Sequence, residues 1–175
     1  MVSRRDFIKT SAFASAATIS GGLLPTLSSC NVDPGKITIK SASSKFEREP
    51  LVRPFGFKGV YQNEFWVAAA QLESNSGLRH VGLQTQCLAW SDLEVFLANS
   101  EFDGNMLLIK SLDYALQMIK GQSFNNPIEL QDAILDDVYK YGQSLTNNKK
   151  LRMTFTLSSM VALDNALWML YAQEN

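Results

Sequence analysis

The stretch NEFWVAAAQLESNSGLRHVGLQTQ, residues 63–86, decides the fold. Its first part, residues 63–73, combines aromatic side chains with three consecutive alanines, and we interpret it as a central strand. The SNSG sequence at 74–77 is typical of a turn. Residues 79–86 then alternate, with apolar Val81 and Leu83 two positions apart, as a strand does. The stretch therefore predicts an antiparallel hairpin.

Upstream of this hairpin, the sequence predicts one more strand and a loop. Ile37 and Ile39 alternate with polar residues, which indicates a half-buried strand and completes a three-stranded meander. The pattern breaks over residues 41–60, where charged and aromatic side chains are interrupted by Pro50, Pro54, Gly56 and Gly59. We predict a long ordered loop there, and such loops inside compact domains are usually functional or mobile.

Downstream of residue 86 the apolar period changes from two to about 3.6, which predicts helices. Four are predicted. The first three have capping signals: one after Ser91-Asp92, one from Ser111 to Gly121, and one from Asn126 to Gly142. The fourth, from about Arg152 to Ala172, is indicated by its apolar stripe. Strands followed by helices predict an α+β fold, a three-stranded antiparallel meander followed by three to four helices packed on one face of the sheet.

The first residues indicate an export address. SRRDFIK, residues 3–9, places Arg4 and Arg5 before a mildly apolar stretch, as in a twin-arginine (Tat) signal. LSSC, residues 27–30, matches a bacterial lipobox, in which Cys30 receives lipid. We therefore expect a Tat signal peptide at 1–29, a tether at 30–35 and one domain at 36–175. The protein is expected to be exported to the periplasm or anchored to a membrane as a lipoprotein.

The net charge and the few reactive side chains argue against nucleic-acid binding and against a catalytic or metal site. The net charge is −1 at pH 7, no basic stripe is present, and nucleic acid is therefore not an expected partner. His80 and Cys87 have no flanking residues at metal-ligand spacing, so both are interpreted as structural. No residue of the chain is assigned a catalytic or metal-binding role.

The closing stretch ALDNALWML, residues 162–170, resembles the last capping-domain helix of the mandelate racemase and muconate lactonizing enzyme branch of the enolase superfamily. The order of the predicted strands and helices agrees with that domain, and the resemblance covers most of residues 36–175. It implies an enolase-like N-terminal capping domain. In that family a separate barrel supplies the Mg²⁺ ligands and the bases that remove a proton beside a carboxylate. The chain ends at Asn175, where the resemblance places the first barrel strand, so no cofactor is assigned to this chain.

The resemblance also implies which residues contact a substrate. Two capping-domain loops of the family close over the barrel mouth, and they correspond to residues 41–60 and about 85–92 of this sequence. Arg53 and Lys58 would face an anionic carboxylate, because both carry a positive charge. Three aromatic side chains would exclude water from it: Phe55, Phe57 and Trp90.

These observations lead to competing functional hypotheses. The first is an exported capping domain that selects a small carboxylic acid, with a separate barrel chain or a homo-oligomer as partner and isomerase or dehydratase activity only when a barrel is supplied. The alternative is a non-catalytic binding module, held at a membrane surface by its lipid, or a truncated remnant.

Overall fold

The computed structural model describes residues 35–175, so the predictions made for Arg4, Arg5 and Cys30 lie outside the described residues. The elements are β1 (Ile37–Phe57), β2 (Val60–Ser74), β3 (Arg79–Gln86), α2 (Leu88–Ser91), α3 (Leu93–Ala98), α4 (Glu101–Ile119), β4 (Ser123–Phe124), α5 (Pro127–Thr146) and α6 (Met153–Glu174). None of the described helices is long and apolar enough to cross a membrane.

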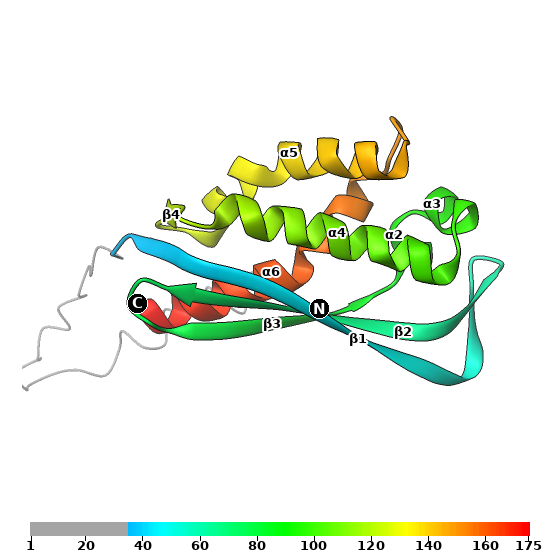
Figure 1. The fold of residues 1–175 in the computed structure, drawn as a ribbon, viewed down its shortest axis with the longest axis horizontal. Helices are drawn as coiled ribbons and strands as arrows, with labels where there is room; N and C mark the ends of the chain where they lie inside the picture. Colours follow the sequence, from blue (N-terminus) through cyan, green and yellow to red (C-terminus); the bar gives the residue numbers. More distant parts are fainter. Residues whose placement is uncertain (1–34) are drawn as a thin grey trace, which may run out of the picture. The chain divides into compact units, whose positions relative to one another are not determined.

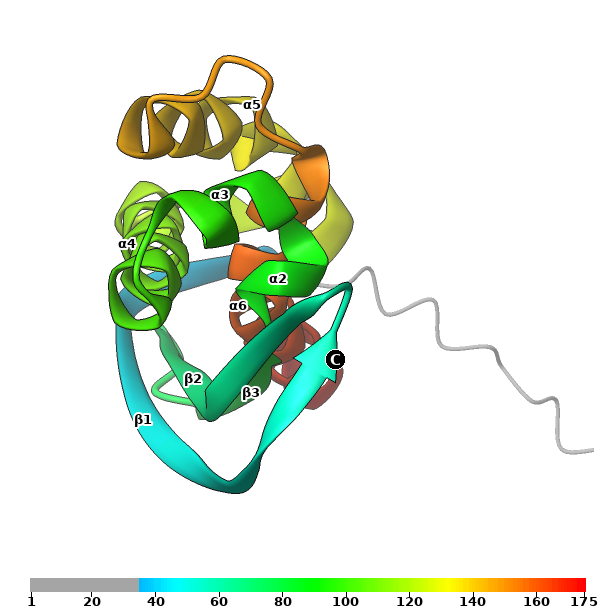
Figure 2. The ribbon, with the colours of Figure 1, turned by 90° about the vertical axis from the view of Figure 1, so that its right-hand side faces the viewer.

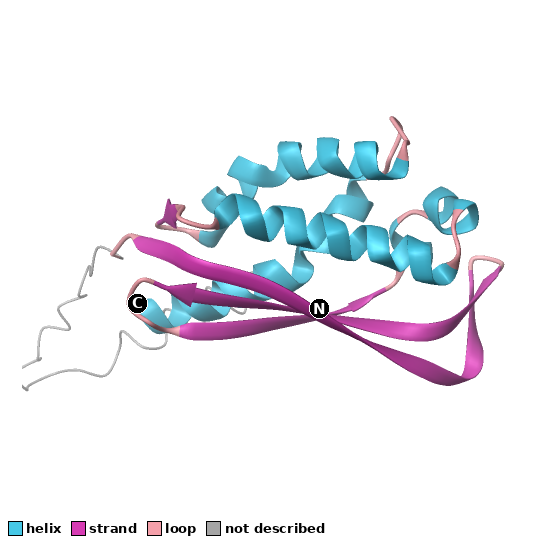
Figure 3. Ribbon diagram, in the orientation of Figure 1, coloured by secondary structure: helices cyan, strands magenta, loops and turns pink. Residues whose placement is uncertain are grey.

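The strands form one antiparallel sheet in the order β3-β2-β1-β4 (Figures 1 and 3). The helices lie on one side of it, with α4 against β1, α6 against β3, and α5 packed on α4 and α6 (Figure 2). The predicted α+β fold, a meander followed by helices, is confirmed. The two-residue strand β4 adds a fourth member that the sequence analysis did not predict.

The core lies between the sheet and the helix layer. Strand β2 contributes every second residue to it, and α4 and α6 contribute stripes spaced three and four apart, as amphipathic elements do. The fully buried members from these three elements include Trp66, Ala68, Ala70, Leu72, Leu108, Leu112, Leu116, Leu163, Leu167 and Leu170. The alternation of buried residues along β2 therefore sets which face of the sheet the helices cover.

Strand β3 buries its polar face. Val81 and Leu83 point away from the helices and are exposed, whereas Gly82 and Gln84 face α6. Helix α6 lies so close that a Cβ atom on Gly82 would be 2.0 Å from the Ala162 carbonyl oxygen. The predicted pairing of this strand is confirmed, but close contact with the helix backbone, rather than apolar burial, determines its orientation.

The prediction of a long loop at residues 41–60 is wrong, because this stretch is the greater part of β1 and the turn into β2. Pairing with β2 shifts between Pro50 and Phe55, which absorbs the irregularity of the two prolines. Beyond Thr38 the outer edge of β1 has no strand partner among the described residues. An edge strand tolerates proline because no neighbouring strand needs its missing N–H.

Two predicted helix boundaries are also wrong. Helix α4 begins eleven positions before Leu112, capped by Ser100, whose hydroxyl accepts from the Asp103 amide at 3.0 Å. Ser111 is buried inside that helix. Helix α5 continues past Gly142 to Thr146 and ends at Asn147, which adopts a left-handed conformation (φ 49°). The caps predicted at Asp92 and Asn126 are confirmed.

Candidate functional site

The tip of the β1–β2 hairpin reaches the segment that follows β3. Lys58 and Gly59 have φ values of 52° and 80°, as the two-residue turn of a twisted hairpin requires. The Lys58 ammonium donates to the carbonyl oxygens of Trp90 at 3.3 Å and Ala89 at 3.5 Å. The structure therefore brings together the two segments predicted to contact a substrate.

A groove lies beside this junction, between the end of β3 and helix α6. Its volume is about 440 Å³, and it is lined by apolar and polar residues: Leu83, Gln84, Thr85, Cys87, Trp90, Ser158 and Val161. Trp90 and Leu83 are each more than half exposed. Gln84 closes the floor, because its amide contacts the Ser158 carbonyl oxygen and accepts from the Ala162 amide at 3.3 Å.

The other predicted site residues lie on the same hairpin, away from the groove lining. Phe55 and Phe57 stack with ring centroids 6.2 Å apart, and the Lys58 ammonium lies 5.2 Å from the Phe57 ring centroid. This distance is within the range of a cation–π contact. Arg53 is exposed on the irregular stretch of β1, and no contact of the described residues brings it to the groove. The structure thus joins Lys58, Phe57 and Trp90 and leaves Arg53 apart.

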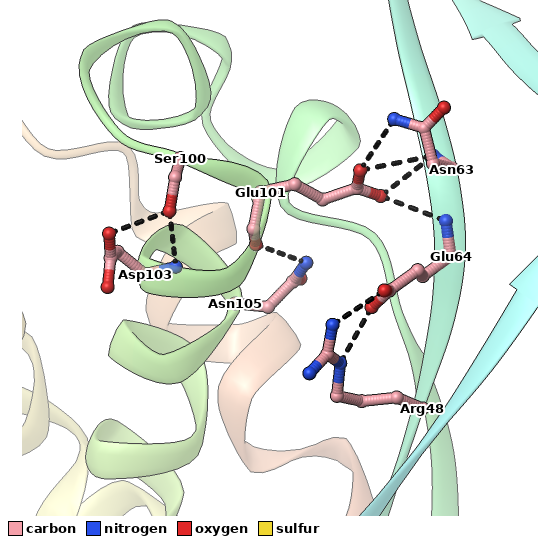
Figure 4. A network of polar contacts seen from close by, with 7 residues as sticks. All are labelled: Arg48, Asn63, Glu64, Ser100, Glu101, Asp103 and Asn105. Carbon is pink, nitrogen blue, oxygen red and sulfur yellow. Dashed lines mark hydrogen bonds and ion pairs between the residues drawn. The ribbon is translucent and has the colours of Figure 1, made fainter.

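A polar network, missed by the sequence analysis, fixes the hairpin to α4 (Figure 4). The Glu101 carboxylate accepts from the backbone amides of Asn63 at 2.9 Å and Glu64 at 3.1 Å, and from the Asn63 side chain at 3.0 Å. Glu64 in turn receives two hydrogen bonds from the Arg48 guanidinium, at 2.6 and 2.7 Å. These bonds hold the pKa of Glu64 below its ordinary value. The hairpin therefore leaves the helix layer at a fixed angle.

The segment that bears Trp90 is anchored by hydrogen bonds to residues at the start of α6. Asp92 accepts from the Glu94 and Val95 amides with one oxygen and from the Arg152 amide, at 3.0 Å, with the other. The Thr154 hydroxyl donates to the Ser91 carbonyl oxygen at 2.6 Å. Both links join α2 and α3 to the start of α6, so Trp90 is presented by a braced turn.

These groups can recognise and shield a ligand. Lys58 offers an ammonium, Phe57 and Trp90 offer ring faces, and the groove offers amide and hydroxyl groups. Across residues 35–175, no cluster of three or more histidine, cysteine, aspartate or glutamate side chains is arranged to hold a metal ion.

No protein-family model matches the chain, and no curated protein matches it. Solved structures of enolase-superfamily enzymes do match it. A dipeptide epimerase from Enterococcus faecalis, complexed with Mg and L-Leu-L-Tyr, is 15% identical with a TM-score of 0.48, covering 78% of this chain and 32% of its own. The L-Ala-D/L-Glu epimerase from Bacillus subtilis is 21% identical with a TM-score of 0.46, covering 78% and 31%. A mandelate racemase/muconate lactonizing protein from Herpetosiphon aurantiacus is 16% identical with a TM-score of 0.44, covering 72% and 30%. The chain spans about a third of the length of these structures.

Proposed function

We propose that this chain is an exported capping domain that selects a small carboxylic acid for an enzyme of the mandelate racemase and muconate lactonizing type. The observation that carries the proposal is the junction of the hairpin tip with the segment after β3, made by the Lys58 ammonium and the Trp90 carbonyl. Two segments 31 or 32 residues apart in sequence thereby form one rim beside a groove.

The proposed roles follow from the side chains at this rim. Lys58 orients an anionic carboxylate, because its ammonium lies at the outermost turn and its hydrogen bonds of 3.3 and 3.5 Å are long enough to exchange. Phe57 and Trp90 exclude water around the ligand, which strengthens its interaction with the ammonium. Mg²⁺ held by a barrel would stabilise the enolate that forms when a proton beside the carboxylate is removed.

Deuterium exchange tests this function. The chain is joined after Asn175 to the barrel of an enzyme of this type that lacks its own capping domain. Exchange beside the carboxylate is followed by NMR in D₂O with Mg²⁺, across dipeptides, 2-hydroxy acids and sugar acids. We expect exchange by the fusion but not by the barrel alone, and a changed substrate preference for Trp90→Ala. A fusion no more active than the barrel, although folded by circular dichroism, would contradict the proposal.

Calorimetry on the chain alone, together with the exchange experiment, separates the alternative, a tethered module without catalysis. The exposed side chains of Leu83 and Trp90 beside the groove offer apolar surface for ligand binding. Such a module binds a member of the acid panel, measured by calorimetry on the chain alone, and leaves the activity of the barrel unchanged.

We also propose export and anchoring, with Cys30 as the lipid attachment site. Cys30→Ala is expected to move the protein from the membrane fraction to the soluble fraction, and Arg4→Lys with Arg5→Lys to retain it in the cytoplasm. An unchanged membrane fraction for Cys30→Ala argues against the anchor.

A further inference from the structure

The outer edge of β1 is available for pairing. Its first two residues, Ile37 and Thr38, pair with β4, and the Ile39 backbone exchanges hydrogen bonds with Gly121 and Gln122. From Ser41 onward the same edge has no strand partner among the described residues, and β1 forms the rim of the sheet in Figure 2. A strand edge with unpaired N–H and C=O groups is a template for another strand.

The residues along this edge are complementary to themselves. Consider an antiparallel pair of two identical strands centred on Phe46. Lys45 of the first copy then lies opposite Glu47 of the second, and Glu47 of the first copy lies opposite Lys45 of the second. Both side chains point to the face of the sheet away from the helices, because Phe46 pairs with the helix-facing Ala68. Opposite charges placed directly across two strands stabilise the pairing.

We propose that the edge of β1 from Ala42 to Pro50 pairs antiparallel with the same edge of a second copy of this chain, with Phe46 on the twofold axis. The proposal goes beyond the function proposed above and does not depend on it. The two sheets become one continuous sheet, and β4 already shows that this edge accepts a strand.

A shallow groove with both apolar and polar lining residues supports this position of the axis. It has a volume of about 390 Å³, lies between β1 and α4, and is lined by Ser44, Lys45, Phe46, Met106, Ile109 and Asp113. Phe46 is 37% exposed although it stacks on Trp66 at 5.0 Å. With Phe46 on the axis, the two grooves adjoin, so the pairing strands also bury apolar surface.

The ends of the pairing segment are fixed by the chain itself. Pro50 lacks an N–H group, and the register of β1 against β2 shifts between Pro50 and Phe55. At the other end, the backbone N–H and C=O groups of Ile39 are already hydrogen-bonded to residues 122 and 121. The free edge between them is about nine residues long, about 30 Å at the rise of a strand.

Charge reversal tests the register. Light scattering and sedimentation on the full chain in detergent, and on a chain starting at residue 31, measure the dimer dissociation constant. We expect Lys45→Glu and Glu47→Lys each to weaken the dimer about tenfold or more, because both symmetric pairs become repulsive. The double variant Lys45→Glu with Glu47→Lys should restore it. Glu49→Lys is the control, because Glu49 faces Ser43 in this register and should change the constant less than threefold.

Cross-linking gives a second measurement that does not depend on charge. With Cys30 and Cys87 replaced by serine, Lys45→Cys with Glu47→Cys should form a disulfide-linked dimer faster than either single variant. A chain that stays monomeric at the highest soluble concentration would overturn the proposal. A dimer that responds equally to all reversals, without rescue by the double variant, would also overturn it.

Discussion

The two halves of the β1–β2 hairpin are built from the same two strands but are held in different ways. In the half near the helices, Trp66, Ala68 and Leu72 are fully buried. In the half beyond Glu64, Val52 is completely exposed and Tyr61 is 70% exposed. That outer half is fixed by the Glu101 network at its base and by Lys58 at its tip. The inner half is therefore held by apolar burial, and the outer half is held by polar contacts and stays exposed.

The difference follows from the magnitudes of the interactions. Burying one large apolar side chain contributes about 1.5–3 kcal/mol, whereas a net hydrogen bond contributes about 0.5–1.5 kcal/mol. The inner half has several buried apolar side chains, whereas the outer half has only a few hydrogen bonds. Changes in the inner half should thus affect global unfolding, and changes in the outer half should affect local opening.

The largest effect is expected from Gly82→Ala, in the strand β3 that pairs with the inner half at Ala70. The new Cβ would meet the Ala162 carbonyl oxygen at 2.0 Å and the Ala166 nitrogen at 2.4 Å, and helix backbone cannot yield to it. We expect a loss of about 4 kcal/mol or more in the free energy of unfolding, measured with urea. Gly35→Ala is the matched control, because nothing lies within 4 Å of its Cβ position. Equal stability of the two variants would refute the close contact with α6.

The second prediction compares the two halves directly. Leu72→Ala should cost about 3 kcal/mol in the free energy of unfolding, because it removes a fully buried side chain from the core. Val52→Ala should change it by less than about 0.5 kcal/mol, since Val52 is entirely exposed. Comparable losses in both variants would mean that the outer half is covered in solution.

The third prediction loosens the outer half alone. Glu101→Ala removes the acceptor for the Asn63 and Glu64 amides. Hydrogen exchange at these two amides should accelerate by roughly tenfold, as expected for loss of bonds to a charged acceptor. Exchange at Ala68 and Ala70 should remain as in the parent. Glu129→Ala, another acidic residue in a first helical turn, serves as the control.

The smallest effect concerns the pH dependence of the free energy of unfolding. Each half contains one glutamate whose pKa is lowered by hydrogen bonds. Hydrogen bonds from Lys40 and Arg79 lower the pKa of Glu73, and those from Arg48 lower the pKa of Glu64. Since the folded pKa lies below the unfolded value near 4.5, both contributions are complete above that pH and are lost as pH falls through the folded pKa. Urea midpoints measured below pH 5 should fall less steeply for Glu73→Gln and Glu64→Gln than for the parent. Parallel curves for parent and variants would contradict the lowered values.

Local signals predicted part of this structure. The SNSG turn and the caps at Asp92 and Asn126 could be read from sequence, because each depends on neighbouring residues. The strand at residues 41–57 could not, since prolines and charges are typical of loops and only an edge position tolerates them. Ser111 was mistaken for a cap, although Ser100 and Asp103 are spaced as a capping pair and would have indicated the true start of the helix.

The candidate site was predicted less completely. Lys58 and Trp90 were named on a resemblance, and their contact spans 32 residues. The Glu101 network spans 37 or 38 residues and has no local pattern that would indicate it. Contacts at such separations depend on the path of the whole hairpin. They could not be predicted because residues 41–60, which form most of β1, were interpreted as a loop.

The brace around Asp92 has a consequence for how this domain can vary in length. Its two carboxylate oxygens bind amides on both α3 and the start of α6, so an inserted residue between Cys87 and Asp92 would displace Asp92 and break its long-range bond to the Arg152 amide. Among the described residues, the Lys58–Gly59 turn is held only by the Lys58 side chain, through hydrogen bonds of 3.3 and 3.5 Å, so residues added after Gly59 would lengthen the exposed tip without breaking a backbone contact to another element. Insertions that enlarge or reshape the rim should therefore be tolerated at the tip of the hairpin, while the opposite wall keeps its length.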